Sequence, residues 1–199
     1  MEQLTVLVDL DDTIEDLLTA WIHALNERFG RDVDPEHVRL WDVLEYYPGL
    51  SKSDIYSVFD WDNFWSNVKP KPGAVEYLKR LIDDGHKVYI TTATYYLNIQ
   101  VKMEMVLFKY FPFIKWDQVI IAQDKAMVYG DVIIDDGIHN HLRKRRLNVL
   151  MDAPHNRHID ASTIGAVRVT SMEEAYRAVS ELANRNRSLI HKEVPNDCN

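Results

Sequence analysis

Two aspartates, Asp9 and Asp11, stand one residue apart after a short apolar run, and a second acidic pair, Asp135-Asp136, follows another such run. Carboxylates this close repel one another, and burying them is costly unless a cation neutralises their charge. Neither Cys nor His interrupts either pair. Oxygen-only donors suit a hard cation such as Mg²⁺ better than zinc. The two acidic pairs therefore predict a magnesium site.

Two further side chains could hold the oxygens of a phosphoryl group. Thr92 ends an apolar segment and offers a hydroxyl, and Lys125 precedes the second acidic pair and offers a point charge. Each residue alone has an ordinary explanation, because an Asp after a strand often caps a helix, a strand Thr is common and a Lys is usually solvated. All of them at one edge of a sheet would instead indicate a phosphate-handling site.

The chain that must position these groups alternates between short apolar runs and amphipathic segments. The runs expected to form strands are 4–8, 87–92, 118–121, 131–135, 147–151 and 166–169. The main helical patterns cover 17–29, 74–84 and about 95–110, and a last helix follows Ser171. This alternation predicts an α/β fold, a Rossmann-like, mostly parallel sheet flanked by helices, with ligands at the carboxyl ends of the strands.

The segment between the first strand and the second lacks strand alternation and is rich in aromatic and acidic residues. We expect it to form a small helical cap inserted after the first strand. The predicted division is a phosphatase core of residues 1–13 and 72–185, a cap of residues 14–71 and a polar C-terminal tail of residues 186–199.

The acidic motifs resemble those of a known superfamily. Asp9-Leu10-Asp11-Asp12-Thr13 resembles the DxDxT signature of the haloacid dehalogenase superfamily of phosphatases. Thr92, Lys125 and Asp135-Asp136 are similar to its second, third and fourth motifs, in the same order. The resemblance covers roughly residues 4–155. It implies a phosphatase rather than a dehalogenase, because a halide leaves without a proton and needs no acid at position 11.

A narrower resemblance is to the 5'(3')-deoxyribonucleotidase family and its bacterial or phage relatives. It is carried by Pro72-Gly73-Ala74, by Asp124-Lys125 before the acidic pair, and by the later run Asp-Ala-Pro-His-Asn at 152–156. Ala93 and Gly137 depart from the serine and the arginine that eukaryotic members carry there. These departures bear on the substrate more than on the chemistry.

The resemblance implies a role for each motif residue. Asp9 would be the nucleophile that forms an aspartyl-phosphate, and Asp11 would protonate the leaving group and then activate water. Mg²⁺ would be held by Asp9, by the backbone carbonyl of Asp11 and by Asp136, with Asp135 beside it. Thr92, Ala93 and Lys125 would bind the phosphoryl oxygens.

Two roles are expected for the aromatic residues of the cap. Most would form the core of a small helical unit, whereas Phe64 and Trp65, just before the chain returns to the sheet, are the candidates for stacking on a nucleobase. A cap of this kind restricts substrates to small molecules. We therefore predict a phosphomonoesterase that acts on nucleoside or deoxyribonucleoside monophosphates. The alternatives are a phosphatase for another small phosphate, such as a sugar phosphate, and a catalytically silent binding protein.

The composition excludes several partners. The net charge of −8 argues against binding to polymeric nucleic acid. No apolar run approaches the roughly 18 residues needed to span a membrane, and the first residues lack the basic start of a signal peptide. The single cysteine, Cys198, agrees with a reducing compartment. The sequence thus predicts a cytoplasmic protein with a small phosphorylated substrate, and a homodimer is compatible with it.

Overall fold

The computed structural model describes residues 2–61, 63–141 and 146–190. Within these ranges, six strands form one parallel sheet in the order β3-β2-β1-β4-β5-β6. Their bounds are β1 Thr5–Asp9, β2 Lys87–Thr92, β3 Val119–Ile121, β4 Val132–Asp135, β5 Leu147–Met151 and β6 Ala166–Val169. The predicted Rossmann-like parallel sheet is confirmed.

The register of the central strands brings the two acidic pairs together. In β1, Val8 pairs with Ile134 of β4, so the next residues, Asp9 and Asp135, leave neighbouring strands at the same edge. On the other side of β1, Asp9 pairs with Thr91 of β2. The carboxyl edge of β1, β2 and β4 therefore gathers the polar residues that the sequence placed at the strand ends.

Helices bury one face of the sheet. The helices α4 (Ala74–Asp83) and α7 (Met172–Ile190) pack against each other, with the rings of Tyr77 and Tyr176 5.8 Å apart. Their apolar residues share a hydrophobic cluster with Val6 and Val8 of β1. The helix α7 runs into the range predicted as a polar tail, and residues 191–199 lie outside the described part. The domain boundaries stay a prediction.

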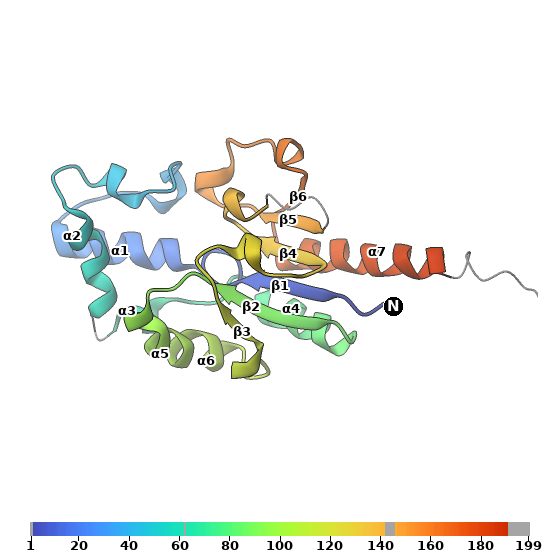
Figure 1. Cartoon of the computed structure of the whole chain (residues 1–199). Coiled ribbons are helices and arrows are strands. Elements are labelled where there is room, and N and C mark those ends of the chain that lie inside the picture. The colour runs from blue at the N-terminus through green and yellow to red at the C-terminus, as the bar shows by residue number, and fades with distance from the viewer. Residues whose placement is uncertain (1, 62, 142–145, 191–199) are drawn as a thin grey trace, which may run out of the picture.

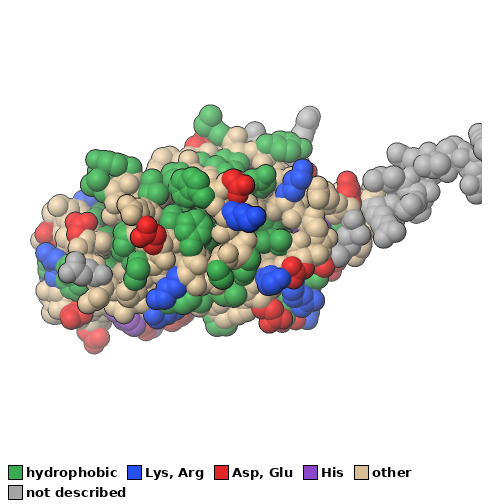
Figure 2. Space-filling view, turned by 90° about the horizontal axis from the view of Figure 1, so that it is seen from below, with side chains coloured by type: hydrophobic (Ala, Val, Ile, Leu, Met, Phe, Trp, Pro, Cys, Tyr) green, Lys and Arg blue, Asp and Glu red, His purple; other side chains and the backbone are tan. Residues whose placement is uncertain are grey.

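The segment expected as one helix from about residue 95 to 110 is broken into pieces. A 3₁₀ turn at Tyr96–Asn98 leads into α5 (Ile99–Lys102), a π-helical segment at Met103–Leu107 and α6 (Phe108–Tyr110). A π-helical turn adds residues to the helical repeat and is frequent at functional sites. Seen from below (Figure 2), the molecule shows hydrophobic side chains over much of the surface, with acidic and basic groups among them, several of these side by side.

The cap lies beyond the carboxyl edge of the sheet (Figure 1). It contains α1 (Leu17–Phe29), α2 (Lys52–Tyr56) and α3 (Phe64–Asn67). These helices surround a hydrophobic cluster separate from that of the sheet, to which the π-helical segment adds Val106. The remaining described 3₁₀ turns are Pro35–His37, Val43–Tyr46, Ser57–Asp60, Trp116–Gln118, Lys125–Met127, Ile138–His141, Pro154–Asn156 and Ala161–Ile164.

Within the described ranges, none of the helices combines the length and the apolar character that a membrane crossing requires.

Candidate active site

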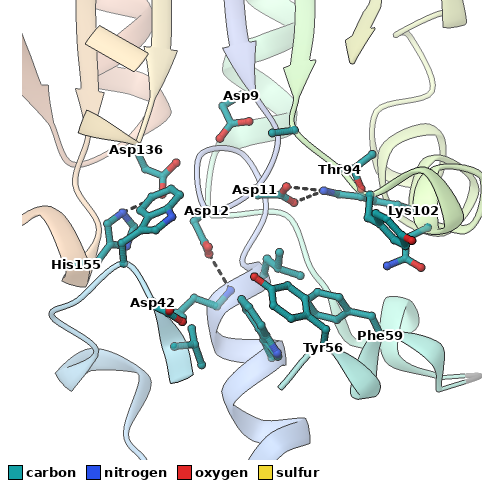
Figure 3. Close-up of a pocket in the computed structure, with 18 of the residues that line it drawn as sticks. Asp9, Asp11, Asp12, Asp42, Tyr56, Phe59, Thr94, Lys102, Asp136 and His155 are labelled. Carbon is teal, nitrogen blue, oxygen red and sulfur yellow. Dashed lines mark hydrogen bonds and ion pairs between the residues drawn. The ribbon is translucent and has the colours of Figure 1, made fainter. Parts of the chain in front are cut away.

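A cavity of about 970 Å³ lies between the carboxyl edge of the sheet and the cap. Both parts line it (Figure 3). The core supplies Asp9, Asp11, Lys125 and the acidic pair, and the cap supplies mainly aromatic and aliphatic side chains. A volume of this size is at the upper end of the range, about 300–1,000 Å³, that accommodates small-molecule ligands.

The turn after β1 brings Asp9 and Asp11 into the same cavity. Asp12 has a φ of 54°, in the left-handed region that non-glycine residues rarely adopt. Its side chain accepts a hydrogen bond of 2.8 Å from the backbone N–H of Leu18 at the start of α1, and Lys71 donates to its carbonyl. Burial and the nearby Asp136 raise the pKa of Asp12 to about 7. These contacts hold the turn in a strained conformation.

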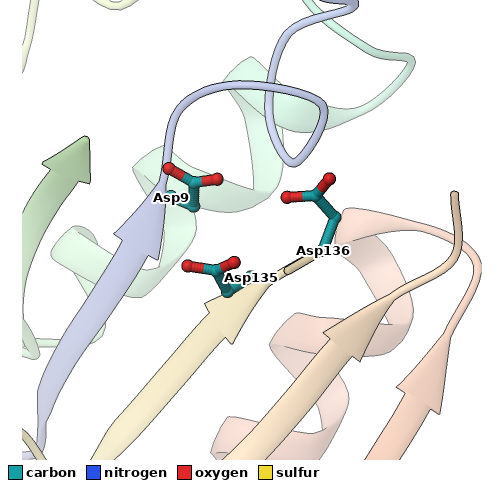
Figure 4. Close-up of side chains that lie close together, drawn as sticks. All are labelled: Asp9, Asp135 and Asp136. Carbon is teal, nitrogen blue, oxygen red and sulfur yellow. The ribbon is translucent and has the colours of Figure 1, made fainter. Parts of the chain in front are cut away.

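Three buried carboxylates converge at this edge (Figure 4). Asp9, Asp135 and Asp136 each offer one oxygen, and these atoms lie within 4.8 Å of one another. Burial raises the pKa of Asp9 well above its usual range; Lys125 opposes this rise, and the neighbouring carboxylates add to it. An oxygen-only set with excess negative charge fits a hard divalent cation.

The two members of the acidic pair have different surroundings. Asp135 accepts hydrogen bonds from the Gly137 N–H at 2.8 Å, from Asn140 Nδ2 at 2.9 Å and from Lys125 Nζ at 2.9 Å. A Cβ at position 137 would lie 2.9 Å from Asn140 Nδ2 and from His139 Cε1, so a larger residue there would require these side chains to shift. The carboxylate of Asp136 makes only longer contacts among the described residues, to Thr13 Oγ1 at 3.4 Å and to His155 Nε2 at 3.2 Å. Asp136 therefore has more free capacity for a cation.

Lys125 is a buried cation among these acids. Its Nζ lies 2.5 Å from Asp9 Oδ1 and 2.9 Å from Asp135 Oδ2. The two carboxylates raise the pKa of Lys125 although burial opposes the rise. Asp124 caps the short 3₁₀ turn that carries Lys125, because its side chain accepts from the Ala126 N–H at 2.9 Å. Asp124 therefore stabilises the turn that positions Lys125, which explains why the two residues are adjacent.

The residues expected to bind phosphate oxygens lie at different depths. Thr92 is fully buried and is not part of the cavity lining, whereas Ala93 and Thr94 line it. The Thr92 hydroxyl is 3.4 Å from the Nζ of Lys102. The phosphate-binding roles of Thr92, Ala93 and Lys125 stay predictions.

Lys102 is a site residue that the sequence reasoning missed. It is 1% exposed, forms an ion pair with Asp11 (Figure 3), and its Nζ lies 5.8 Å from the centre of the Trp65 ring. Burial would raise the pKa of Asp11, but Lys102 outweighs it and the pKa is lowered. One signal in the sequence could have indicated that Lys102 is buried. It is next to Met103 and four residues before Val106, on the apolar face of its helix.

Two more missed residues touch the acidic groups. Glu15 is fully buried, and burial together with Asp11 raises its pKa well above the usual value. His155, 3.2 Å from Asp136, has a raised pKa because Asp136 outweighs the effect of burial. Nothing in the local sequence pattern around Glu15 distinguishes it from a solvated residue at the start of a helix.

The two aromatic residues proposed for base stacking are both buried in the hydrophobic cluster of the cap, with their rings 5.0 Å apart. Trp65 also lines the cavity, whereas Phe64, whose ring is 4.9 Å from that of Phe59, is not part of the lining. Exposed side chains also line the cavity: Leu40, Trp41 and Tyr56 from the cap, and Tyr95 and Leu97 from the segment after β2. The assignment of a base-stacking role stays a prediction.

The sheet and the acidic residues at its carboxyl edge define a haloacid dehalogenase-like α/β fold. The structure is similar to a haloacid dehalogenase-like hydrolase of Streptococcus pneumoniae, with a TM-score of 0.64 and 16% identity over 89% of this chain and 98% of that one. It is also similar to a hydrolase of that family from Deinococcus radiodurans, solved with bound phosphate and sodium, with a TM-score of 0.57 and 18% identity over 90% and 96% of the two chains. At these identities the likeness shows the fold.

The sequence comparisons identify the family. Residues 3–186 match the model of the family described as 5' nucleotidase, deoxy (pyrimidine), cytosolic type C protein. A 5'(3')-deoxyribonucleotidase of Bacillus subtilis is 30% identical over 173 residues, which cover 86% of this chain and 96% of the relative. The human mitochondrial 5'(3')-deoxyribonucleotidase is 31% identical over 67% of this chain and 62% of the relative. The chain belongs to this 5'-nucleotidase family, and it is a phosphatase.

Proposed function

We propose that the protein hydrolyses nucleoside monophosphates, with deoxyribonucleotides as its main substrates. The single observation that carries the proposal is the shared cavity, in which buried acids and lysines of the core face an apolar cap wall. A phosphate ester needs the charged side, and a nucleoside needs the apolar side. Membership of a family whose relatives are named 5'(3')-deoxyribonucleotidases supports the same substrate class.

Asp9 is proposed as the nucleophile. It ends β1, and Lys125 lies 2.5 Å from one of its oxygens, which favours the charged form that attack on phosphorus requires. The attack forms a bond between the Asp9 carboxylate and phosphorus while the bond to the leaving oxygen breaks. Water then cleaves the aspartyl-phosphate and restores Asp9.

Asp11 is proposed as the general acid and base. It lines the same cavity two residues further along the chain, and Lys102 holds its carboxylate in place through their ion pair. The ion-paired carboxylate is the form that takes a proton from water in the second step. To give a proton to the leaving alkoxide in the first step, Asp11 must enter that step protonated, against the effect of Lys102. Thr92, Ala93 and Lys125 are proposed to bind the phosphoryl oxygens.

Mg²⁺ is the proposed cofactor. Asp9, the backbone carbonyl of Asp11 and Asp136 would hold it, and Asp135 would stay bound to Lys125, Gly137 and Asn140. A bound Mg²⁺ offsets negative charge on the transferring phosphoryl group. A cytoplasmic location and a homodimer stay predictions from the sequence.

The test is the release of phosphate from a panel of 5' and 3' deoxyribonucleotides, ribonucleotides and sugar phosphates, each assayed with Mg²⁺. We expect the highest kcat/KM on a deoxyribonucleotide, no activity after EDTA, and recovery with Mg²⁺ but not with Zn²⁺. A preference for sugar phosphates over every nucleotide would refute the proposed nucleotidase activity but would still agree with a phosphatase. Near-zero turnover of all substrates, including p-nitrophenyl phosphate, would favour a binding protein.

A further inference from the structure

One segment of the cap, residues 35–42, is attached to the core at two places. At one end, Glu36 Oε2 lies 2.7 Å from Arg157 Nη1, an ion pair between cap and core. At the other end, the ring of Trp41 packs edge-on against two core imidazoles, His139 at 5.0 Å and His155 at 4.9 Å between ring centres. Trp41 and both histidines line the substrate cavity.

The segment between these two attachments is held against the rest of the cap. Val38 is 1% exposed and belongs to the hydrophobic cluster of the cap. The Tyr46 hydroxyl accepts hydrogen bonds from the backbone N–H groups of Arg39 and Leu40. Asp42 caps the following turn by accepting from the Leu44 N–H at 3.0 Å. The residues between Glu36 and Trp41 therefore form an ordered connection rather than a loose loop.

The core side of the ion pair is fixed by a chain of charged contacts. Arg157 Nε lies 2.7 Å from Asp152 Oδ2, and Asp152 Oδ1 lies 2.8 Å from Arg168 Nη1. Arg168 also donates to Asn156 Oδ1 at 2.7 Å, and Asn156 Nδ2 donates to the carbonyl of Asp136 at 2.9 Å. The group that contacts Glu36 is thus connected to the loop that carries the proposed metal ligand.

We propose that Glu36 and Arg157 form a clasp that positions Trp41 and thereby sets the substrate-facing wall of the cavity. Glu36 is a positioning residue, because it acts through the segment that carries Trp41 and does not line the cavity. Both partners are partly exposed, with side-chain exposures of 38% for Arg157 and 68% for Glu36. Such exposed pairs are weak, so this one can open and close reversibly. The proposed clasp depends on the proposed function in one respect: it takes this cavity to be the substrate-binding site.

The first test does not depend on activity. The full chain is labelled with 5-fluorotryptophan, and the fluorine signal of Trp41 is assigned by its loss in Trp41→Phe. Glu36→Arg places a second cation against Arg157, so we expect the Trp41 signal to shift or broaden. Glu45→Arg is the matched control, since it makes the same charge change at an exposed cap residue to which no described residue is ion-paired. An unchanged Trp41 signal in Glu36→Arg overturns the clasp.

The second test reads the consequence for substrate. On a deoxyribonucleoside monophosphate, Glu36→Arg should raise KM about two- to five-fold with kcat unchanged, and 0.5 M salt should reduce the difference from wild type. Trp41→Ala should raise KM more, and adding Glu36→Arg to it should cause no further increase. Multiplying effects in the double variant would overturn the coupling. A wild type inactive on nucleotides but active on another phosphate ester would refute the proposed substrate, while the fluorine result would still decide the clasp.

Discussion

The core side and the cap side of the cavity differ in burial and in charge. On the core side, Asp9, Lys125 and Asp135 are almost fully buried and each contacts an opposite charge. On the cap side, Trp41 is 60% exposed and Tyr56 is 46% exposed, although both line the cavity. The core fixes charges at short distances, whereas the cap presents an apolar surface that remains open to solvent.

The difference has an energetic consequence. Removing one partner from a buried ion pair leaves an uncompensated charge, which typically costs about 3–5 kcal/mol. A change in the exposed wall of the cap alters only local contacts and should affect substrate binding more than the chemical step. Core substitutions should therefore change kcat strongly, and cap substitutions should change KM moderately.

The largest effect is expected for Asp9→Asn. A neutral amide is a poor nucleophile in this setting, so turnover should fall below a few percent of wild type in a phosphate-release assay. The melting temperature should stay close to that of wild type, because Asn has nearly the same shape as Asp and Lys125 keeps its ion pair with Asp135, 2.9 Å away. The control is Asp117→Asn, an exposed residue that does not line the cavity, which should keep full activity. Substantial turnover by Asp9→Asn would exclude covalent catalysis by this residue.

Asp11→Asn should rank second. A general acid or base typically contributes about 10²–10⁴-fold, so kcat on a nucleotide should fall within that range while KM changes little. The loss should be smaller on p-nitrophenyl phosphate, whose leaving group needs little protonation. Steady-state kinetics on the two substrates distinguish this role from a structural one. Equal losses on both would argue against Asp11 as the acid.

The cap should respond differently to two adjacent substitutions. Trp65 lines the cavity, so Trp65→Ala should raise KM for a nucleotide by an amount equivalent to about 1–3 kcal/mol and barely affect glycerol phosphate, which has no ring to stack. Phe64 packs within the cap, so Phe64→Ala should lower stability by about 3–5 kcal/mol and change both substrates in parallel. Thermal unfolding and kinetics on both substrates give the comparison. Parallel losses in Trp65→Ala would make Trp65 a structural residue only.

The smallest effect concerns stability. Burial and Asp11 raise the pKa of Glu15 in the folded protein, so its protonated form is favoured there. Its contribution to folding is fully present below the unfolded pKa and is lost as pH rises toward the folded value. Glu15→Gln stays neutral, so its free energy of unfolding relative to wild type should increase from pH 5 to pH 8 in urea titrations. The exposed Glu27→Gln serves as the control, and a pH-independent difference would show that Glu15 is not held protonated.

Local sequence determined the strands and the acidic edge. Short β-branched runs, each followed by polar residues, specify buried parallel strands because few other structures satisfy so continuous an apolar run. Once those strands are parallel, Asp9 and Asp135 must emerge at one edge, as the register shows. The ordered motifs then predicted a phosphatase, which the family membership confirms.

Only the tertiary structure decided which other side chains reach that edge. Lys102 meets Asp11 from 91 residues away, and its sequence neighbours say only that it lies on an apolar helix face. Phe64 and Trp65 are adjacent and alike in chemistry, yet the short helix α3 directs only Trp65 into the cavity lining. The local sequence pattern shows which side chains are apolar and at what spacing the apolar residues repeat. The partner of a buried charge depends on how distant elements pack, and only the packed chain brings those elements together.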